Sequence, residues 1–159
     1  MKPKININYI LAGCVVVLSL LCVLSVLKPL NFQKEQAQRE VIVKKRLLKI
    51  RTAEERYRQK YKTYTGSFST LIRQGFLADS LQYIPFAGKK RFDLQATVQL
   101  GKSGRQIPLM ECGAGYHDYL SGMDSDEIEQ LIEKANTAGQ YPGLKFGDIE
   151  TDNNNEVNW

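Results

Sequence analysis

The sequence has few of the residues that build metal centres and disulfide frameworks. It contains three cysteines and one histidine among 159 residues, and Cys14 and Cys22 lie inside an apolar run. A disulfide framework needs paired cysteines, and a zinc site needs several cysteine or histidine ligands at short spacing. We therefore expect no disulfide framework, no metal site and no cofactor in this chain.

The sequence also lacks a clear catalytic constellation. Cys112 and His117 come closest to a nucleophile and its base, with Glu111 and Asp118 beside them. Nearness in sequence does not supply the geometry that a nucleophile and a base require. The Gly-Lys-Ser of residues 101–103 lacks the spacing of a phosphate-binding loop and the helix after it. We expect a protein that is not an enzyme, with a hydrolase in the C-terminal part as an alternative.

Charge is absent from residues 9–27, which are mostly apolar. As a helix this run would span about 28 Å, close to the roughly 30 Å hydrocarbon core of a bilayer. It continues to Leu27 without the small-residue site of a cleaved signal peptide. Residues 9–27 are therefore predicted to form a transmembrane helix after a short N-terminal segment, residues 1–8. The alternative is a lipoprotein, because Leu-Ala-Gly precedes Cys14 and would make it the lipid-bearing residue.

Charges are segregated along the rest of the chain. Residues 28–62 hold twelve Lys or Arg and four Asp or Glu, whereas residues 63–159 hold eight and thirteen. This pattern predicts a basic helical stem, residues 28–62, that carries an acidic head, residues 63–159. Tyrosines among basic residues can also indicate nucleic-acid binding, which is the alternative function. The pattern does not favour a small-molecule site.

The stem favours a helix, because residues 31–62 contain no Gly or Pro and are rich in good helix formers. Apolar residues recur in it at helical spacing from Val43 to Tyr64, which is typical of one buried face. We predict that this face packs on the head through Ile50, Tyr57, Tyr61, Tyr64, Leu71 and Leu77. A small head leaves the N-terminal half of the stem uncovered, so we predict contact with a protein partner or a second copy through Val41, Val43, Leu47 and Leu48.

The head begins with a turn and a hairpin. Gly66 is predicted to end the stem helix, with a short helix capped by Ser67 or Ser69 after it. Strict alternation over residues 91–100 predicts a half-buried strand. A return strand is expected over residues 106–112, where proline at position 108 favours a sheet edge.

The C-terminal third is expected to add a loop, a helix and a strand. Residues 113–122 are predicted to form the loop, and Asp124 to cap a helix over residues 125–136. An edge strand is expected within residues 144–149. The polar tail is predicted to be frayed, as chain ends commonly are. The alternative there is a calcium site at Asp152, Asn154 and Glu156.

The region where stem and head meet resembles a known family. Residues 53–77 read AEERYRQKYKTYTGSFSTLIRQGFL. After an N-terminal membrane helix, this run resembles the exit of the long helix in type IV pilins and type II secretion pseudopilins. The matching residues are Tyr57, Tyr61, Tyr64, Thr65, Leu71, Gly75 and Leu77. The resemblance covers about residues 1–80, and the chain is also similar to small single-span proteins of Bacteroidetes-type bacteria with no assigned role.

The resemblance implies an α+β fold in which a transmembrane helix continues into a long amphipathic helix and carries a small antiparallel-sheet head. It implies a structural or assembly role in a pilus-like or secretion-like envelope complex of the bacterial inner membrane, with the head extracytoplasmic. The abundance of Lys and Arg after the span opposes this orientation, because positive residues tend to stay in the cytoplasm. The usual prepilin-peptidase site, Gly-Phe with a Glu at the fifth mature position, is missing before the apolar run.

Overall fold

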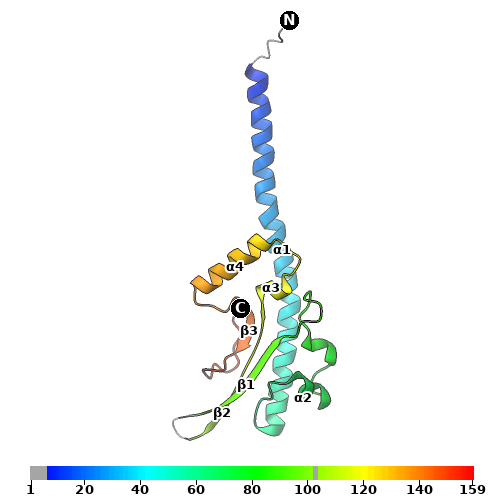
Figure 1. Cartoon of the computed structure of the whole chain (residues 1–159), viewed down its shortest axis with the longest axis vertical. Helices are drawn as coiled ribbons and strands as arrows, with labels where there is room; N and C mark the ends of the chain where they lie inside the picture. Colours follow the sequence, from blue (N-terminus) through cyan, green and yellow to red (C-terminus); the bar gives the residue numbers. More distant parts are fainter. Residues whose placement is uncertain (1–6, 102–103) are drawn as a thin grey trace. The chain divides into compact units, whose positions relative to one another are not determined.

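A computed structural model describes residues 7–101 and 104–159, apart from the side chains of residues 23–29. The chain divides into two compact units, an N-terminal unit up to Glu35 and a C-terminal unit from Gln36 to Trp159. Helix α1, Ile7–Tyr61, is 55 residues long and contributes to both units (Figure 1). The stem is thus helical, as the composition predicted.

In the N-terminal unit, α1 exposes its apolar side chains. Tyr9 is 74% exposed and Val15 62% exposed, and all sixteen residues from Ile7 to Cys22 are exposed. No helix within the described residues is both long and apolar enough to cross a membrane. The predicted span, residues 9–27, lies partly outside the residues whose side chains are described.

Helix α1 ends at Tyr61 and is closed by the lysine after it rather than by the predicted glycine. Lys62 has a φ of 65°, and its N–H donates to the carbonyl of Arg58 at 2.8 Å. This left-handed residue closes the helix four positions before Gly66. Gly66, at a φ of 58°, serves a different purpose, because a Cβ there would lie 2.8 Å from the backbone nitrogen of Ala96. The glycine lets the turn lie directly on the sheet.

The sheet has three antiparallel strands in the order β1-β2-β3. Strand β1 is Asp93–Leu100, β2 is Gln106–Gly115 and β3 is Gly143–Gly147. The predicted hairpin and the added strand are confirmed, so the chain is α+β. Strand β2 is central, contrary to the edge position predicted from its proline. The proline is tolerated because β3 pairs only with residues 111–115 of β2, which leaves the neighbourhood of Pro108 unpaired on that side.

The half-buried strand predicted from alternation over residues 91–100 is confirmed for only part of its length. Leu94 and Ala96 are half-buried, but Val98 is 48% and Leu100 75% exposed. Figure 1 shows the β1–β2 hairpin extending away from the other elements of the C-terminal unit.

Short helices complete the C-terminal unit. They are α2 (Phe68–Arg73), the 3₁₀ helix η1 (Asp79–Gln82), α3 (Tyr116–Tyr119) and α4 (Ser125–Thr137). The prediction for α4 is confirmed, including its cap, since Asp124 accepts a hydrogen bond from the N–H of Asp126 at 3.0 Å. The loop expected over residues 113–122 is wrong in part, because β2 continues to Gly115 and α3 follows it at once.

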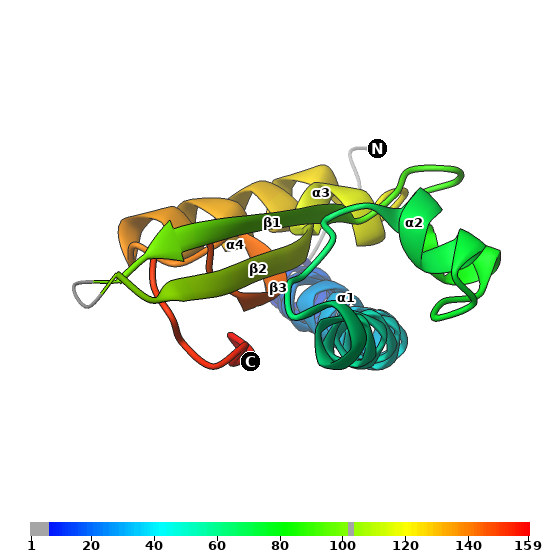
Figure 2. The same cartoon turned by 90° about the horizontal axis from the view of Figure 1, so that it is seen from below.

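The core of the C-terminal unit joins α1 to the sheet. Figures 1 and 2 show the strands beside the C-terminal part of α1, with α2 on a different side of that helix from β3. The fully buried apolar side chains come from α1, α2, β2, β3 and from α3 with the residue after it: Val43, Leu47, Ile50, Leu71, Met110, Cys112, Tyr119, Leu120 and Phe146. Burial of α1 on one face at helical spacing explains why a small sheet can be stable here.

The C-terminal tail is ordered rather than frayed. Val157 forms a bridge with Phe146, and the N–H of Gly147 donates to the carbonyl of Glu156 at 2.8 Å. The side chain of Asn158 adds two bonds, accepting from the N–H of Lys145 at 2.9 Å and donating to the carbonyl of Gly143 at 3.0 Å. These contacts hold the tail along the free edge of β3.

Candidate functional site

The joint between α1 and the sheet contains a buried carboxylate. Glu54 is fully buried, and its two oxygens accept hydrogen bonds from the N–H groups of Thr65 at 2.9 Å and Gly66 at 3.1 Å. Burial raises the pKa of Glu54, and the two backbone bonds partly offset that rise. Glu54 thus ties the turn after α1 back to the helix. This role of Glu54 was not predicted from the sequence, although the residue lies between Ile50 and Tyr57 on the apolar side of the helix.

The tyrosines predicted to pack on the head have separate environments. Tyr64 is buried, whereas Tyr57 is half-buried and Tyr61 is 40% exposed. The ring of Tyr57 lies 4.5 Å from that of Tyr61 and 5.8 Å from that of Phe76. The hydroxyl of Tyr61 donates to Gln74 at 3.1 Å. Tyr57 and Tyr61 therefore contact the segment after α2 rather than the sheet.

The other predicted stem–head contacts lie in the core of the C-terminal unit. Ile50 and Leu71 are fully buried, and Leu77 is 6% exposed. They belong to the same buried face of α1 and to the turn and helix that fold back on it.

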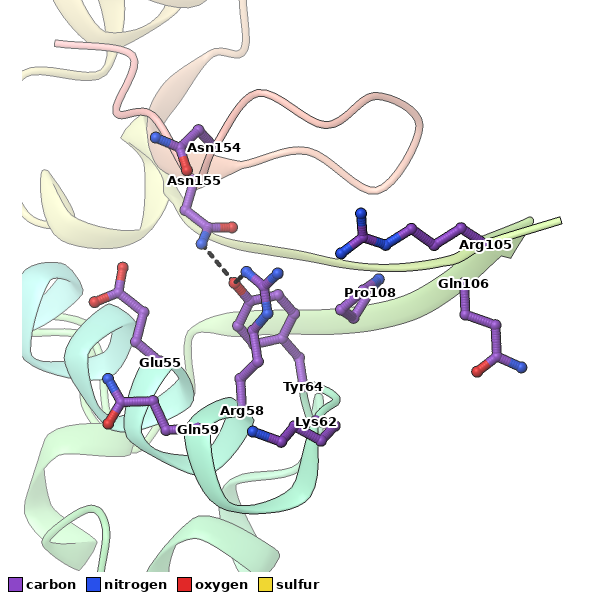
Figure 3. A pocket seen from close by; sticks show the side chains of 10 residues that line it. All are labelled: Glu55, Arg58, Gln59, Lys62, Tyr64, Arg105, Gln106, Pro108, Asn154 and Asn155. Carbon is purple, nitrogen blue, oxygen red and sulfur yellow. Dashed lines mark hydrogen bonds between the residues drawn. The ribbon is translucent and has the colours of Figure 1, made fainter. Parts of the chain in front are cut away.

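A basic cleft of about 490 Å³ lies beside Tyr64 (Figure 3). The hydroxyl of Tyr64 accepts hydrogen bonds from Arg58 at 2.8 Å and from the side chain of Asn155 at 2.7 Å. These bonds join the end of α1 and the turn after it to the segment after β3 that contains Asn155. The lining consists of Glu55, Arg58, Gln59, Lys62, Tyr64, Arg105, Gln106, Pro108, Asn154 and Asn155. With three cationic side chains and one carboxylate, the cleft suits anionic or polar groups rather than apolar ligands.

Cys112 and His117 do not have the environment of a nucleophile and a base. Cys112 is fully buried in β2, and burial raises its pKa well above the usual value. His117 is exposed on α3. A thiol must ionise to act as a nucleophile, so Cys112 is placed as a core side chain.

The surface of α1 open to a partner differs from the predicted one. Val41 is 51% and Leu48 39% exposed, but Val43 and Leu47 are fully buried. The prediction of partner contact is therefore wrong for Val43 and Leu47. The reason is that the C-terminal unit covers α1 further toward its N-terminus than expected, since Arg39 already donates to the carbonyl of Ser121 at 2.9 Å.

The exposed side of α1 in the C-terminal unit is basic and apolar. We call it the outer stripe; it consists of Val41, Ile42, Lys45, Leu48, Lys49, Thr52 and Arg56. A groove of about 330 Å³ runs beside it, between α1 and the segment of residues 76–81. Leu48, Phe76 and Leu77 are apolar residues that line the groove, and Lys49 and Arg56 line it with positive charge.

Within the residues that the structure describes, no three Cys, His, Asp or Glu residues group as metal ligands would. Comparison with known proteins finds no matching family model, no matching curated protein and no matching solved structure.

Proposed function

We propose that this chain is a non-enzymatic, single-pass membrane protein of the bacterial inner membrane. In this proposal it acts as a structural or assembly component of an envelope complex, with the C-terminal unit extracytoplasmic and binding protein partners. The observation that carries the proposal is the exposure of large apolar side chains all around α1 in the N-terminal unit. Val15, Val16, Val17 and Leu18 are consecutive, and each is more than half exposed.

A helix that is apolar on every side needs an apolar environment, because exposed apolar patches of this extent are rare in soluble proteins. A bilayer supplies it, since the uncharged sequence continues to Leu27 and reaches the length of a membrane span. The long helix with a small antiparallel sheet on its C-terminal part supports the resemblance to pilins and pseudopilins. That resemblance favours assembly with other proteins over catalysis.

Nucleic-acid binding is the second candidate, favoured by Lys45, Lys49 and Arg56 on the outer stripe. Single-stranded nucleic acid usually also needs aromatic rings on which bases can stack. Tyr64 is buried, and the ring of Tyr57 lies between a tilted contact with Tyr61 and an edge-on contact with Phe76. This arrangement favours a protein partner.

Two arginines in the apolar run should release the chain from membranes. We expect the wild-type chain to stay in the membrane fraction after an alkaline carbonate wash. The double variant Val16→Arg/Leu20→Arg should appear largely in the supernatant, because each arginine costs about 3 kcal/mol near the centre of a membrane helix. The matched control Val16→Leu/Leu20→Val should behave as wild type.

Release of the wild-type chain by carbonate would contradict the proposal. Cys14→Ser separates the lipoprotein alternative: a lipid-anchored chain should lose its anchor in this variant, whereas a membrane-spanning chain should keep it. Equal retention of wild type and Cys14→Ser supports the span.

A further inference from the structure

The outer stripe carries positive charge only. Lys45, Lys49 and Arg56 are all exposed, and none of them forms an ion pair with any part of the chain that is described. Lys45 and Lys49 are four residues apart and therefore lie about 6 Å apart along the helix. These three side chains are exposed beside the groove that residues 76–81 form with α1, so their charges are available to a neighbouring molecule.

Helix α4 presents the opposite charge. Asp126, Glu129 and Glu133 are exposed and lie at helical spacing on one face, and no ion pair forms on these carboxylates among the described residues. Glu129 and Glu133 repeat the roughly 6 Å spacing of the two lysines. Ile132 borders this face and is half-exposed, although the apolar side of α4 packs inward through Ile128 and Ala135.

We propose that the outer stripe of one copy binds the acidic face of α4 in a second copy. Lys45 and Lys49 would pair with Glu129 and Glu133, and the groove beside Leu48 would receive an apolar side chain such as Ile132. This inference rests on the proposed assembly function and identifies the partner as the chain itself. Complementary charge on two surfaces of one chain, at the same spacing, is the observation that favours a second copy over another anion.

The two surfaces differ, so the contact is heterologous. Each copy uses its outer stripe toward one neighbour and α4 toward another, and such contacts form a ring or an open array rather than a closed dimer. Exposed ion pairs are individually weak and salt-sensitive. Confinement of the copies in one membrane would raise their effective concentration and let a few such pairs hold an assembly.

A charge exchange tests the contact in the full-length chain. The variants are Lys45→Glu/Lys49→Glu on the outer stripe and Glu129→Lys/Glu133→Lys on α4. Each is reconstituted in vesicles at low salt and treated with a photoactivated bis-diazirine crosslinker, whose reaction does not depend on the exchanged lysines, and the oligomers are separated by gel electrophoresis. We expect each variant alone to lose oligomers on the order of tenfold, since like charges then face each other. An equimolar mixture of the two should recover them.

The control for the outer-stripe variant is Arg73→Glu/Lys89→Glu, which makes the same change in net charge as that variant at exposed positions outside the outer stripe. It should oligomerise as wild type does. Wild-type oligomerisation of both exchanged variants, or a mixture that does not recover, would overturn the contact. So would loss of oligomers in the outer-stripe variant alone with loss of binding to DNA, which would indicate a nucleic-acid surface.

The proposed function and this contact fail in different ways. A wild-type chain that resists the carbonate wash but stays monomeric in vesicles overturns the contact and leaves the membrane span intact. A wild-type chain that the carbonate wash releases from the membrane overturns the proposed function itself.

Discussion

Replacement of Gly147 by alanine should lower the free energy of unfolding by about 4 kcal/mol and detach β3 from the sheet. Gly147 has a φ of 74°, and a Cβ there would overlap the carbonyl oxygen of Met110 in β2. The left-handed conformation alone costs alanine about 1–2 kcal/mol. The overlap adds to this cost because the obstacle is backbone in the central strand, which cannot rotate away as a side chain can.

Gly139→Ala is the matched control for Gly147→Ala. Its φ is 65°, but a Cβ there would meet none of the described atoms within 4 Å. It should therefore cost only about 1 kcal/mol. Urea unfolding of the full-length chain in detergent, followed by the fluorescence of its one tryptophan, Trp159, measures both. Equal losses in the two variants would contradict close packing of β2 and β3 at this glycine.

Replacement of Glu54 by alanine should lower the free energy of unfolding by about 3 kcal/mol, because it leaves the N–H groups of Thr65 and Gly66, both half-buried residues, without their acceptor. Glu54→Gln should cost about half as much, since its amide oxygen still accepts one of the two bonds while its NH₂ group faces the other donor. The same urea titration measures both variants. A cost below 1 kcal/mol for Glu54→Ala would contradict the role of this carboxylate in the joint.

The ionisation of Glu54 should also make the free energy of unfolding depend on pH. Its pKa is raised in the folded chain, so the folded state holds the proton more tightly than the unfolded state does. The contribution of Glu54 protonation to the free energy of unfolding is therefore complete below the ordinary pKa of Glu. It is lost as the pH rises through the higher pKa that Glu54 has in the folded chain. Relative to Glu54→Gln, the wild-type chain should gain stability as the pH falls from 7 toward the ordinary pKa of Glu. A difference in free energy of unfolding between the two chains that does not change with pH would contradict the raised pKa of Glu54.

Local patterns in the sequence predicted several elements well, because their causes are local. Helix α4 follows from its apolar spacing and from Asp124 at its start, and the β1–β2 hairpin follows from alternation. The helical spacing also predicted the buried face of α1 from Val43 to Ala53, whereas the tyrosines that continue it are only partly buried at position 57 and exposed at position 61. Each of these three predictions depends on residues that are close together in the sequence.

The structure differs from the sequence-based predictions where tertiary contacts determine burial or the ends of elements. The extent of α1 that the C-terminal unit covers depends on α3 and on the carbonyls that Arg39 meets, which explains why Val43 and Leu47 are buried. Glutamate is a good helix former, so its presence at position 54 predicts only a helix. Its role as a hydrogen-bond acceptor depends on the position to which the turn at Thr65 folds back. The end of α1 at Lys62 likewise needs a left-handed lysine, which sequence preferences disfavour.

The labelling of Cys14 and Cys22 in intact membranes tests the central claim most directly. Both thiols are exposed on α1 in the isolated chain, whereas Cys112 is buried. If a bilayer surrounds residues 9–27, Cys14 and Cys22 should stay unlabelled by a membrane-impermeant maleimide. A cysteine introduced by Gln140→Cys, at an exposed position, should react on the side of the membrane that holds the C-terminal unit, and all should react after denaturation in detergent. Reaction of Cys14 and Cys22 in intact membranes as rapid as that of the position-140 cysteine would contradict the membrane span.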